Sequence, residues 1–447
     1  MVNIPDSIDV QGGPITLVFT DNGRVFFSER VSGNIWEIIA AENYKLIKHF
    51  DIVKTTGHYE GGLLGIAVQD DFNKTGYIYA YYTEGPDIDH SKNKVVRFNI
   101  DDGKEEVLIS GIPAGRIHNG GIIAFGPDKK LYIGVGVQDE IKDKSQDKNF
   151  LGGKILCINP DGSIPEDNPF PGSPVYSYGH RNIFGLAFHP KTGKLYACDV
   201  GPNTDDEINI IEPGGNYGWP IVAGYSDNLN FINPIVTYTP TMTPTQSFFL
   251  NDNLYFGSYN YGVIHKLSFT DDGSKVTADK IVYRGKPFGI AGTFISPENE
   301  FFIATTDRIR KIKLTDINSQ KNKYKSMVWV IIALLVIVLG VIGYFVYGNN
   351  FSNNKNNDIN INQTVTPGTI TIQNFSFSPN TLTINVGDTV TWQNNDSTIH
   401  RINASDGRFN SGEISHGDKF SYTFTKSGTY NYYCSIHTYM TGVVIVK

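Results

Sequence analysis

The sequence predicts an all-β chain: a six-bladed β-propeller and a small β-sandwich, joined by one transmembrane α-helix. Three observations support this prediction. The composition, with 46 glycines, 13% aromatic and 19% charged residues, is typical of a β protein with many turns. A turn-and-strand pattern recurs along residues 1–315, and residues 327–347 form one long uncharged apolar run. At 447 residues the chain exceeds what one compact core usually holds, so we expect two or three folding units.

The recurring pattern is a polar turn followed by a short strand of aromatic and β-branched residues. Its six copies begin at Asp21, Asp71, Pro127, Pro190, Asn251 and Pro297. Their spacing of roughly 50 to 60 residues suits a four-stranded blade with some long loops. Six copies therefore predict six blades within residues 1–315.

Charge and cysteine content exclude two classes of protein. The net charge of −7 gives no global basic surface, so we expect no nucleic-acid partner. The three cysteines, Cys157, Cys198 and Cys434, are far apart and odd in number, which argues against a disulfide framework. Cys157 and Cys198 lie in apolar runs and are expected to be buried, whereas Cys434 has neighbours that could bind a metal.

Four stretches of the propeller region carry a family resemblance. They begin at Gly61 (Gly-Gly-Leu-Leu-Gly), His118 (His-Asn-Gly-Gly), Gly179 (Gly-His-Arg-Asn-Ile-Phe-Gly-Leu) and Gly201 (Gly-Pro-Asn-Thr-Asp-Asp-Glu-Ile-Asn), the last followed by Gly-Gly-Asn-Tyr-Gly-Trp-Pro from Gly214. The region resembles the glucose/sorbosone dehydrogenase family of six-bladed propellers. The enzymes of that family use pyrroloquinoline quinone (PQQ) and calcium to oxidise a sugar or alcohol.

The resemblance implies a set of site residues. His118 matches the general base of the family, a role that suits an imidazole because its pKa lies near neutrality. Arg181 and Asn182 match residues that contact the quinone. The implied calcium ligands are the carbonyls of Gly201 and Pro202 for the cofactor-bound ion, with Asp206, Glu207 and Tyr217 near a second, structural ion.

Several charged positions of the family are uncharged in this sequence. By alignment, a cofactor-binding lysine falls at Asn260, two arginines fall near Gly289 and Ala291, and an acidic partner of the histidine falls at Val137. A trianionic quinone needs cationic partners when it is buried, so these departures argue against PQQ. Two interpretations stay open: His118 is catalytic or only packs in the centre, and the propeller is an enzyme or a non-catalytic module that could bind calcium.

The apolar run from Met327 to Tyr347 is long enough to cross the hydrocarbon layer of a bilayer as a helix. Five lysines lie between residues 311 and 325, some of them in the basic juxtamembrane segment 316–326. After the apolar run, Lys355 is the one lysine close by, in the Asn-rich linker 348–367. By the positive-inside rule we expect a single-pass protein of the cell membrane, with the propeller in the cytoplasm and the C-terminal domain outside. Met1 to Asp6 lacks the basic and apolar parts of a signal peptide.

Residues 368–447 alternate apolar and polar positions, as a small β-sandwich does. His400 follows one strand, and a second loop carries Cys434, His437 and Met440 in the spacing Cys-x2-His-x2-Met. One thiolate, two imidazoles and a weak thioether are the ligands of a type 1 (blue) copper ion. A structural zinc site would not explain Met440.

The same region resembles the plastocyanin and amicyanin group of cupredoxins along its full length, including the stretches from Ile399 (Ile-His-Arg-Ile), Phe409 (Phe-Asn-Ser-Gly) and Gly428 (Gly-Thr-Tyr-Asn-Tyr-Tyr-Cys). The resemblance implies an electron carrier with a redox partner protein. A single span would place this copper ion and the propeller's site on opposite faces of the bilayer, so we expect no direct electron transfer between them.

Overall fold

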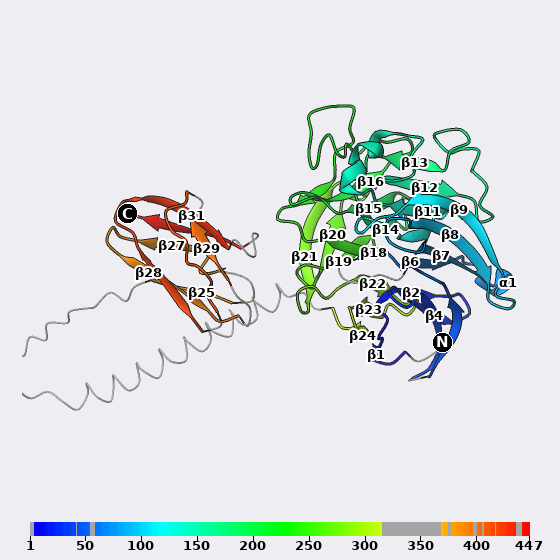
Figure 1. Ribbon diagram of the computed structural model, residues 1–447, viewed down its shortest axis with the longest axis horizontal. Helices are drawn as coiled ribbons and strands as arrows, with labels where there is room; N and C mark the ends of the chain where they lie inside the picture. The colour runs from blue at the N-terminus through cyan, green and yellow to red at the C-terminus, as the bar shows by residue number, and fades with distance from the viewer. Residues whose placement is uncertain are drawn as a thin grey trace, which may run out of the picture. The chain divides into compact units, whose positions relative to one another are not determined.

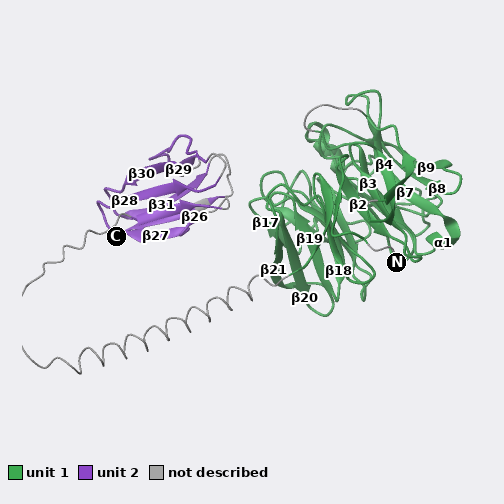
Figure 2. Cartoon of the chain, turned by 90° about the horizontal axis from the view of Figure 1, so that it is seen from below, with its two compact units in different colours: residues 1–329 green, residues 330–447 purple. Residues whose placement is uncertain are grey.

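The structure is a computed structural model that describes residues 4–41, 43–53, 59–314, 368–373, 377–396, 400–404, 406–415, 417–434 and 440–447. The chain divides into two compact units, residues 1–329 and 330–447 (Figure 2). In the described residues the structure is almost entirely β, with one short α-helix, α1 (Phe72–Thr75), and one 3-10 helix, η1 (Asp139–Gln146). The predicted all-β class is confirmed.

Unit 1 consists of six four-stranded antiparallel sheets that follow one another along the chain (Figure 1). The first three, from inner to outer strand, are β2 (Pro14–Phe19), β3 (Val25–Glu29), β4 (Asn34–Ala40) and β5 (Asn43–His49); β6 (Leu63–Val68), β7 (Tyr77–Glu84), β8 (Lys92–Asn99) and β9 (Glu105–Pro113); and β10 (Ile123–Phe125), β11 (Leu131–Val135), β12 (Lys154–Ile158) and β13 (Val175–Tyr178).

The other three are β14 (Ile183–Phe188), β15 (Leu195–Asp199), β16 (Asp206–Ile211) and β17 (Val236–Tyr238); β18 (Pro244–Leu250), β19 (Asn253–Ser258), β20 (Val263–Phe269) and β21 (Val276–Arg284); and β22 (Gly292–Ile295), β23 (Phe301–Ala304), β24 (Arg308–Ile312) and β1 (Ser7–Asp9).

The six inner strands close a ring. Each contacts the next in the order β2, β6, β10, β14, β18, β22, and β22 contacts β2. The N-terminal strand β1 pairs with β24, so the last blade is built from both ends of the propeller sequence. Each copy of the sequence repeat forms the turn into the second strand of a blade and that strand itself. The prediction of a six-bladed propeller is therefore confirmed.

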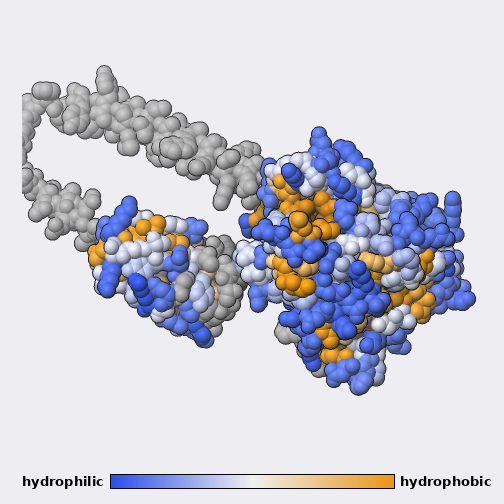
Figure 3. All heavy atoms as spheres, turned by 90° about the horizontal axis from the view of Figure 1, so that it is seen from above, coloured by the Kyte–Doolittle hydropathy of each residue, from blue (hydrophilic) through white to orange (hydrophobic). Residues whose placement is uncertain are grey.

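Buried apolar side chains lie between neighbouring blades as well as within them, which is how a propeller distributes its core. The visible outer face of unit 1 is largely hydrophilic, with separate hydrophobic patches (Figure 3). Because strands alternate in direction, the connections from second to third strand and from outer strand to the next inner strand lie at the same end of the ring. We call this end the loop face.

Unit 2 is a sandwich of two four-stranded sheets over one shared core. The first sheet has the order β26 (Phe377–Ser378), β25 (Gly368–Ile372), β28 (Thr389–Asn394) and β30 (Lys419–Thr423), and the second β27 (Thr381–Ile384), β32 (Thr441–Val446), β31 (Gly428–Cys434) and β29 (Ile402–Ala404). Trp392, fully buried, packs against Tyr432 of the opposite sheet with 5.2 Å between ring centroids. The predicted sandwich is confirmed.

The predicted transmembrane segment, residues 327–347, lies outside the described residues, together with segments 316–326 and 348–367. Within the described part of the chain, none of the helices is both long and apolar enough to cross a membrane. The predicted boundaries at residues 315 and 368 also border this stretch and stay predictions.

Candidate functional sites

Two loops of the loop face bring the predicted propeller residues together. His118 lies between β9 and β10, and Arg181 and Asn182 lie between β13 and β14. The Asn182 Oδ1 accepts a hydrogen bond of 3.1 Å from the backbone N–H of Gly120, which links the two loops. The Asp199 carboxylate, at the end of β15, accepts hydrogen bonds from the backbone N–H groups of Arg181 and Asn182. These hydrogen bonds fix the loop between β13 and β14.

His118 has a left-handed backbone, with φ +59°, and its side chain is buried. The Glu60 carboxylate holds this conformation by accepting the backbone N–H of His118 at 2.7 Å. The imidazole Nδ1 lies 3.8 Å from Asp139 Oδ1 and is buried without a hydrogen-bond partner in the described residues. Burial, with the neighbouring positive charge of Arg181, lowers the pKa of His118.

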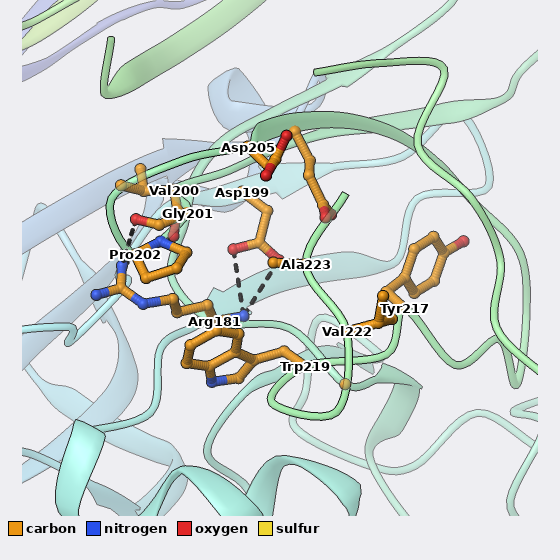
Figure 4. A pocket seen from close by; sticks show the side chains of 12 residues that line it. Arg181, Asp199, Val200, Gly201, Pro202, Asp205, Tyr217, Trp219, Val222 and Ala223 are labelled. Atoms are coloured by element: carbon orange, nitrogen blue, oxygen red, sulfur yellow. Dashed lines mark hydrogen bonds between the residues drawn. The ribbon is translucent and has the colours of Figure 1, made fainter. Parts of the chain in front are cut away.

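Arg181 is the cation of this group. Its Nη1 donates hydrogen bonds to the backbone carbonyls of Val200 (3.0 Å) and Gly201 (2.8 Å) (Figure 4). Its Nη2 lies 3.8 Å from Asp139. The guanidinium carbon stands 5.4 Å from the ring centroid of Trp219. The Arg181 Nε is buried with no hydrogen-bond partner in the residues described. A polar ligand could therefore bond to both Arg181 and His118.

A small acidic cavity lies beside Arg181 (Figure 4). Its volume of about 10 Å³ is room for one water molecule or one ion. Three carboxylates line it, together with the predicted residues Gly201, Pro202 and Tyr217; the carboxylates are Asp199, Asp205 and Glu207. Burial, with the charge of Asp199, raises the pKa of Glu207 to about 8, so a cation bound here would offset a real electrostatic penalty.

Asp206 does not line this cavity, although the resemblance implied it as a ligand. Its carboxylate accepts the backbone N–H groups of Gly201 at 2.8 Å, Met242 at 2.6 Å and Thr243 at 2.7 Å. These hydrogen bonds tie the β15–β16 loop to the next blade. Asp206 therefore serves the loop's geometry rather than facing an ion.

Four carboxylates of these sites were not singled out from the sequence: Glu60, Asp139, Asp199 and Asp205. Glu60 stands immediately before Gly61-Gly62, Asp199 lies two residues before Gly201, and Asp205 lies within the Gly201 stretch, so their positions beside or within matched motifs were a usable signal. Asp139 is two residues after Val137, where an acidic partner of the histidine was judged missing. The structure supplies that acidic partner from the start of η1.

Three of the four predicted copper ligands meet at one end of the sandwich. His400 lies just before β29, Cys434 ends β31 and Met440 directly precedes β32. The backbone N–H of Cys434 donates to the carbonyl of Met440 at 2.9 Å, and the Cys434 Sγ lies 3.6 Å from His400 Nδ1. All three side chains are buried. The fourth predicted ligand, His437, lies outside the described residues.

The orientation of His400 is fixed by a carboxylate. Its Nε2 lies 3.0 Å from Asp396 Oδ2, and Asp396 is itself 9% exposed. Donation from Nε2–H to Asp396 leaves Nδ1, the nitrogen nearest the cysteine sulfur, as the one with a lone pair. The backbone N–H of Arg401 approaches the same sulfur at 3.5 Å.

In the ranges that the structure describes, no cluster of three or more His, Cys, Asp or Glu side chains is arranged to hold a metal ion. Of the predicted copper ligands in the described residues, only His400 and Cys434 are of these residue types, because Met440 is a thioether. The three carboxylates that line the cavity beside Arg181 do not form such a cluster either.

Comparison with known proteins agrees with both units. Residues 12–261 match the family described as glucose/sorbosone dehydrogenase, and residues 337–446 match a cupredoxin-like domain. Quinoprotein glucose dehydrogenase B of Acinetobacter calcoaceticus is 35% identical over 253 residues, 49% of this chain and 52% of that protein. Amicyanin of Paracoccus denitrificans is 35% identical over 71 residues, 15% of this chain and 54% of that protein.

Among solved structures, the PQQ-bound aldose sugar dehydrogenase of Streptomyces coelicolor is 30% identical, with a TM-score of 0.60, over 69% of this chain and 99% of that chain. The chain spans about half the length of several curated relatives that it matches. The chain therefore belongs to the glucose/sorbosone dehydrogenase family and carries a cupredoxin-like domain after its propeller.

Proposed function

We propose that this chain is a membrane-anchored redox protein whose cupredoxin-like domain carries electrons on one type 1 copper ion and whose propeller oxidises a sugar or related alcohol. One observation carries the copper assignment: His400 Nδ1 and Cys434 Sγ, both buried, lie 3.6 Å apart, and the backbone N–H of Cys434 donates to the carbonyl of buried Met440. Imidazole, thiolate and thioether together form a donor set that favours copper over zinc.

The chain's own residues prepare this site. His400, Cys434 and Met440 would hold the ion, with His437 expected as the second imidazole from the Cys-x2-His-x2-Met spacing. Copper would supply a one-electron redox couple. Asp396 holds His400 in one tautomer, and the buried side chains keep water from the sulfur. A site held rigidly in this way changes little between oxidation states, which suits electron transfer.

Metal analysis of the purified full-length chain tests the copper proposal. We expect one copper per chain and the intense visible absorption of a copper–thiolate bond. Cys434→Ser should abolish the absorption, whereas Cys157→Ser, a buried cysteine of the propeller, should leave it unchanged. Absence of the band after copper loading would contradict the proposal.

In the propeller, His118 would accept a proton from a substrate hydroxyl. Its lowered pKa keeps the imidazole neutral at neutral pH, and Asp139 at 3.8 Å stabilises the imidazolium once it forms. Arg181 and Asn182 would orient a polar ligand, since the buried Arg181 Nε has a hydrogen bond to give. Bound PQQ would supply the hydride acceptor. The acidic cavity would hold one calcium ion through the carboxylates of Asp205 and Glu207, and the carbonyls of Gly201 and Pro202 remain those implied for the cofactor-bound ion.

A second candidate function is a non-catalytic propeller tethered to the copper domain. Asn260, where the family has a lysine, gives its amide to the carbonyl of Thr241 at 3.1 Å. Arg181 already donates to two backbone carbonyls, including that of Gly201, an implied calcium ligand. Glu60 and Asp139 also balance the positive charges of Arg30 and Arg181 around His118. The site therefore offers no net positive charge to a trianionic quinone.

Titration with PQQ and calcium distinguishes the two candidates. The enzyme proposal expects a protein-bound quinone spectrum and aldose oxidation with an artificial electron acceptor, both reduced by Arg181→Gln. A spectrum of free quinone and no oxidation of any aldose would favour the non-catalytic module. Because the assay uses an artificial acceptor, its outcome is independent of the copper domain.

The membrane anchor rests on residues 327–347 and their basic flank. In this arrangement the copper domain faces outward and meets a redox partner protein there, while electrons from the cytoplasmic propeller reach it only through other membrane carriers. Labelling single engineered cysteines at Ser274 and Ser411 in intact cells tests the topology. Reagent that does not cross the membrane should label position 411 alone, and equal labelling of both positions would refute the single span.

A further inference from the structure

Lys154 of β12 carries a buried ammonium that the function proposed above does not use. Its side chain is fully buried, and its Nζ donates hydrogen bonds to the backbone carbonyls of Lys144 at 3.2 Å, Ser145 at 2.8 Å and Gly152 at 2.8 Å. None of these acceptors is a carboxylate. Burial lowers the pKa of Lys154 to about 7, although the charge of Asp147 opposes this shift. A methionine would fill the same space without this electrostatic cost, so we expect the ammonium to have a role beyond packing.

The ammonium binds the end of η1. Lys144 and Ser145 belong to the last turn of this 3-10 helix, where backbone carbonyls have few partners within the helix. A cation at this end also interacts favourably with the helix dipole. The helix is interrupted at Ile141, so contacts outside it must fix its course. The position of its first residue, Asp139, therefore depends on how its end is held.

The end of η1 also holds the loop between β13 and β14. Besides the ammonium, the Ser145 carbonyl accepts the backbone N–H of Gly179 at 3.1 Å. The carbonyl of Gly153 accepts the backbone N–H of His180, also at 3.1 Å. Both donors directly precede Arg181, so the peptide groups around the ammonium hold the loop that carries this cation.

A third loop meets η1 at the same place. The Nε2 of Gln146, the last residue of η1, donates to the carbonyl of Trp219 at 2.7 Å and to Asn216 Oδ1 at 3.0 Å. The Trp219 ring lies beside the Arg181 guanidinium. The end of η1 is therefore a junction of the three loops that carry Asp139, Arg181 and Trp219.

We propose that Lys154 is a positioning residue of the central site, which holds Asp139 within reach of His118 by binding the end of η1. None of its hydrogen bonds goes to His118, Asp139 or Arg181, so it acts through the backbone of η1. The inference rests on the proposed role of His118. The pKa of that imidazole can nevertheless be measured without quinone or substrate.

The effect of Asp139→Asn on the His118 midpoint, measured by NMR titration of the full-length chain in several backgrounds, tests the proposal. In the wild-type background the midpoint should fall, because the Asp139 carboxylate favours the imidazolium. In the Lys154→Met background this fall should shrink to about half or less, since Asp139 is no longer held beside the ring. Lys148→Met, which removes an exposed lysine between η1 and β12, should leave the fall unchanged.

Lys154→Gln provides a milder variant, because its amide keeps two donors for the same carbonyls and so supports the fold. We expect an intermediate reduction in this background, and it replaces Lys154→Met if that variant does not fold. An equal fall in the wild-type and both Lys154 backgrounds would overturn the proposal, because Lys154 would then only stabilise the blade. An equal reduction in Lys148→Met, or no fall in any background, would overturn it too.

Quinone binding and aldose oxidation are separate measurements that test the proposed function. Their failure would leave the coupling between Lys154 and Asp139 measurable at His118. A coupling that is absent while aldoses are oxidised would remove the positioning role alone.

Discussion

The backbone N–H of His118, a residue with a left-handed backbone conformation, donates a hydrogen bond to the Glu60 carboxylate. Residues in such strained conformations concentrate at functional sites, where the surrounding structure stabilises them. The imidazole Nδ1 lies 3.8 Å from Asp139, and the charge of Arg181 also acts on the ring. These two charges act on the pKa of His118 in opposite directions.

Asp139→Asn should therefore lower the pKa of His118 further. The Asp139 carboxylate favours the imidazolium, so its removal leaves burial and Arg181, which both favour the neutral ring. NMR titration of the histidine resonances measures this shift without any substrate. Asp143→Asn, an exposed residue of the same η1 helix, is the matched control. An unchanged or raised midpoint in Asp139→Asn would show that the carboxylate does not act on His118.

Asp396 has the corresponding role in the cupredoxin-like domain, since it sets the tautomer of His400. Asp396→Ala should reduce copper affinity about tenfold to a hundredfold, as removal of a carboxylate behind a ligating histidine usually does. Competition with a chelator measures the affinity. Asp406→Ala removes the same charge from an exposed position in this domain and should have little effect. Equal affinities in the two variants would exclude a positioning role for Asp396.

At the scale of elements, the β15–β16 loop lines the acidic cavity. Asp206 anchors this loop, because its carboxylate accepts three backbone N–H groups. The sequence motif from Gly201 predicted where the cavity would lie. It did not separate Glu207, which lines the cavity, from its neighbour Asp206, which does not. Adjacent strand residues point to opposite faces, and only the register of β16 against β15 and β17 decides which carboxylate faces inward.

Calcium should stabilise the propeller, by about 3 kcal/mol when its concentration is 100 times the Kd. Folding raises the pKa of Glu207 from its ordinary value of 4.5 to about 8. Between these two pH values the calcium-free folded state therefore binds one more proton than the unfolded state. Its stability should accordingly fall as pH rises through this window, and calcium should remove that fall.

Thermal unfolding with and without calcium from pH 5 to pH 8.5 measures both effects. Glu207→Gln should abolish most of the calcium response, whereas Glu166→Gln, an exposed glutamate of the neighbouring blade, should retain it. A melting temperature insensitive to calcium throughout would contradict an ion in this cavity.

For the whole molecule, six repeats were enough to predict six blades, because each repeat marks a local turn and the strand after it. The closure of the ring could not be predicted in this way. β1 has three residues and pairs with β24 about 300 residues later, and such a pairing leaves no local pattern. His437 and residues 327–347 lie outside the described structure, so those predictions still depend on the sequence.

Ile8 tests this closure. It is 1% exposed on β1 and belongs to a core cluster with Ile309 of β24. Ile8→Ala should destabilise the propeller by about 2–5 kcal/mol. Because the units are separate, denaturant unfolding should show a shift in the propeller transition alone, and Val31→Ala, at an exposed position, should shift neither. A shift in the cupredoxin transition would contradict two independent units.

The central claim is that the whole chain is a redox protein whose cupredoxin-like domain carries single electrons. Reductive titration of the copper-loaded, full-length chain, followed by its visible absorption, tests it most directly. We expect the absorption to disappear with one electron per chain and to return fully on reoxidation. A chain that binds copper without the absorption, or that loses it irreversibly, would contradict a role as a single-electron carrier.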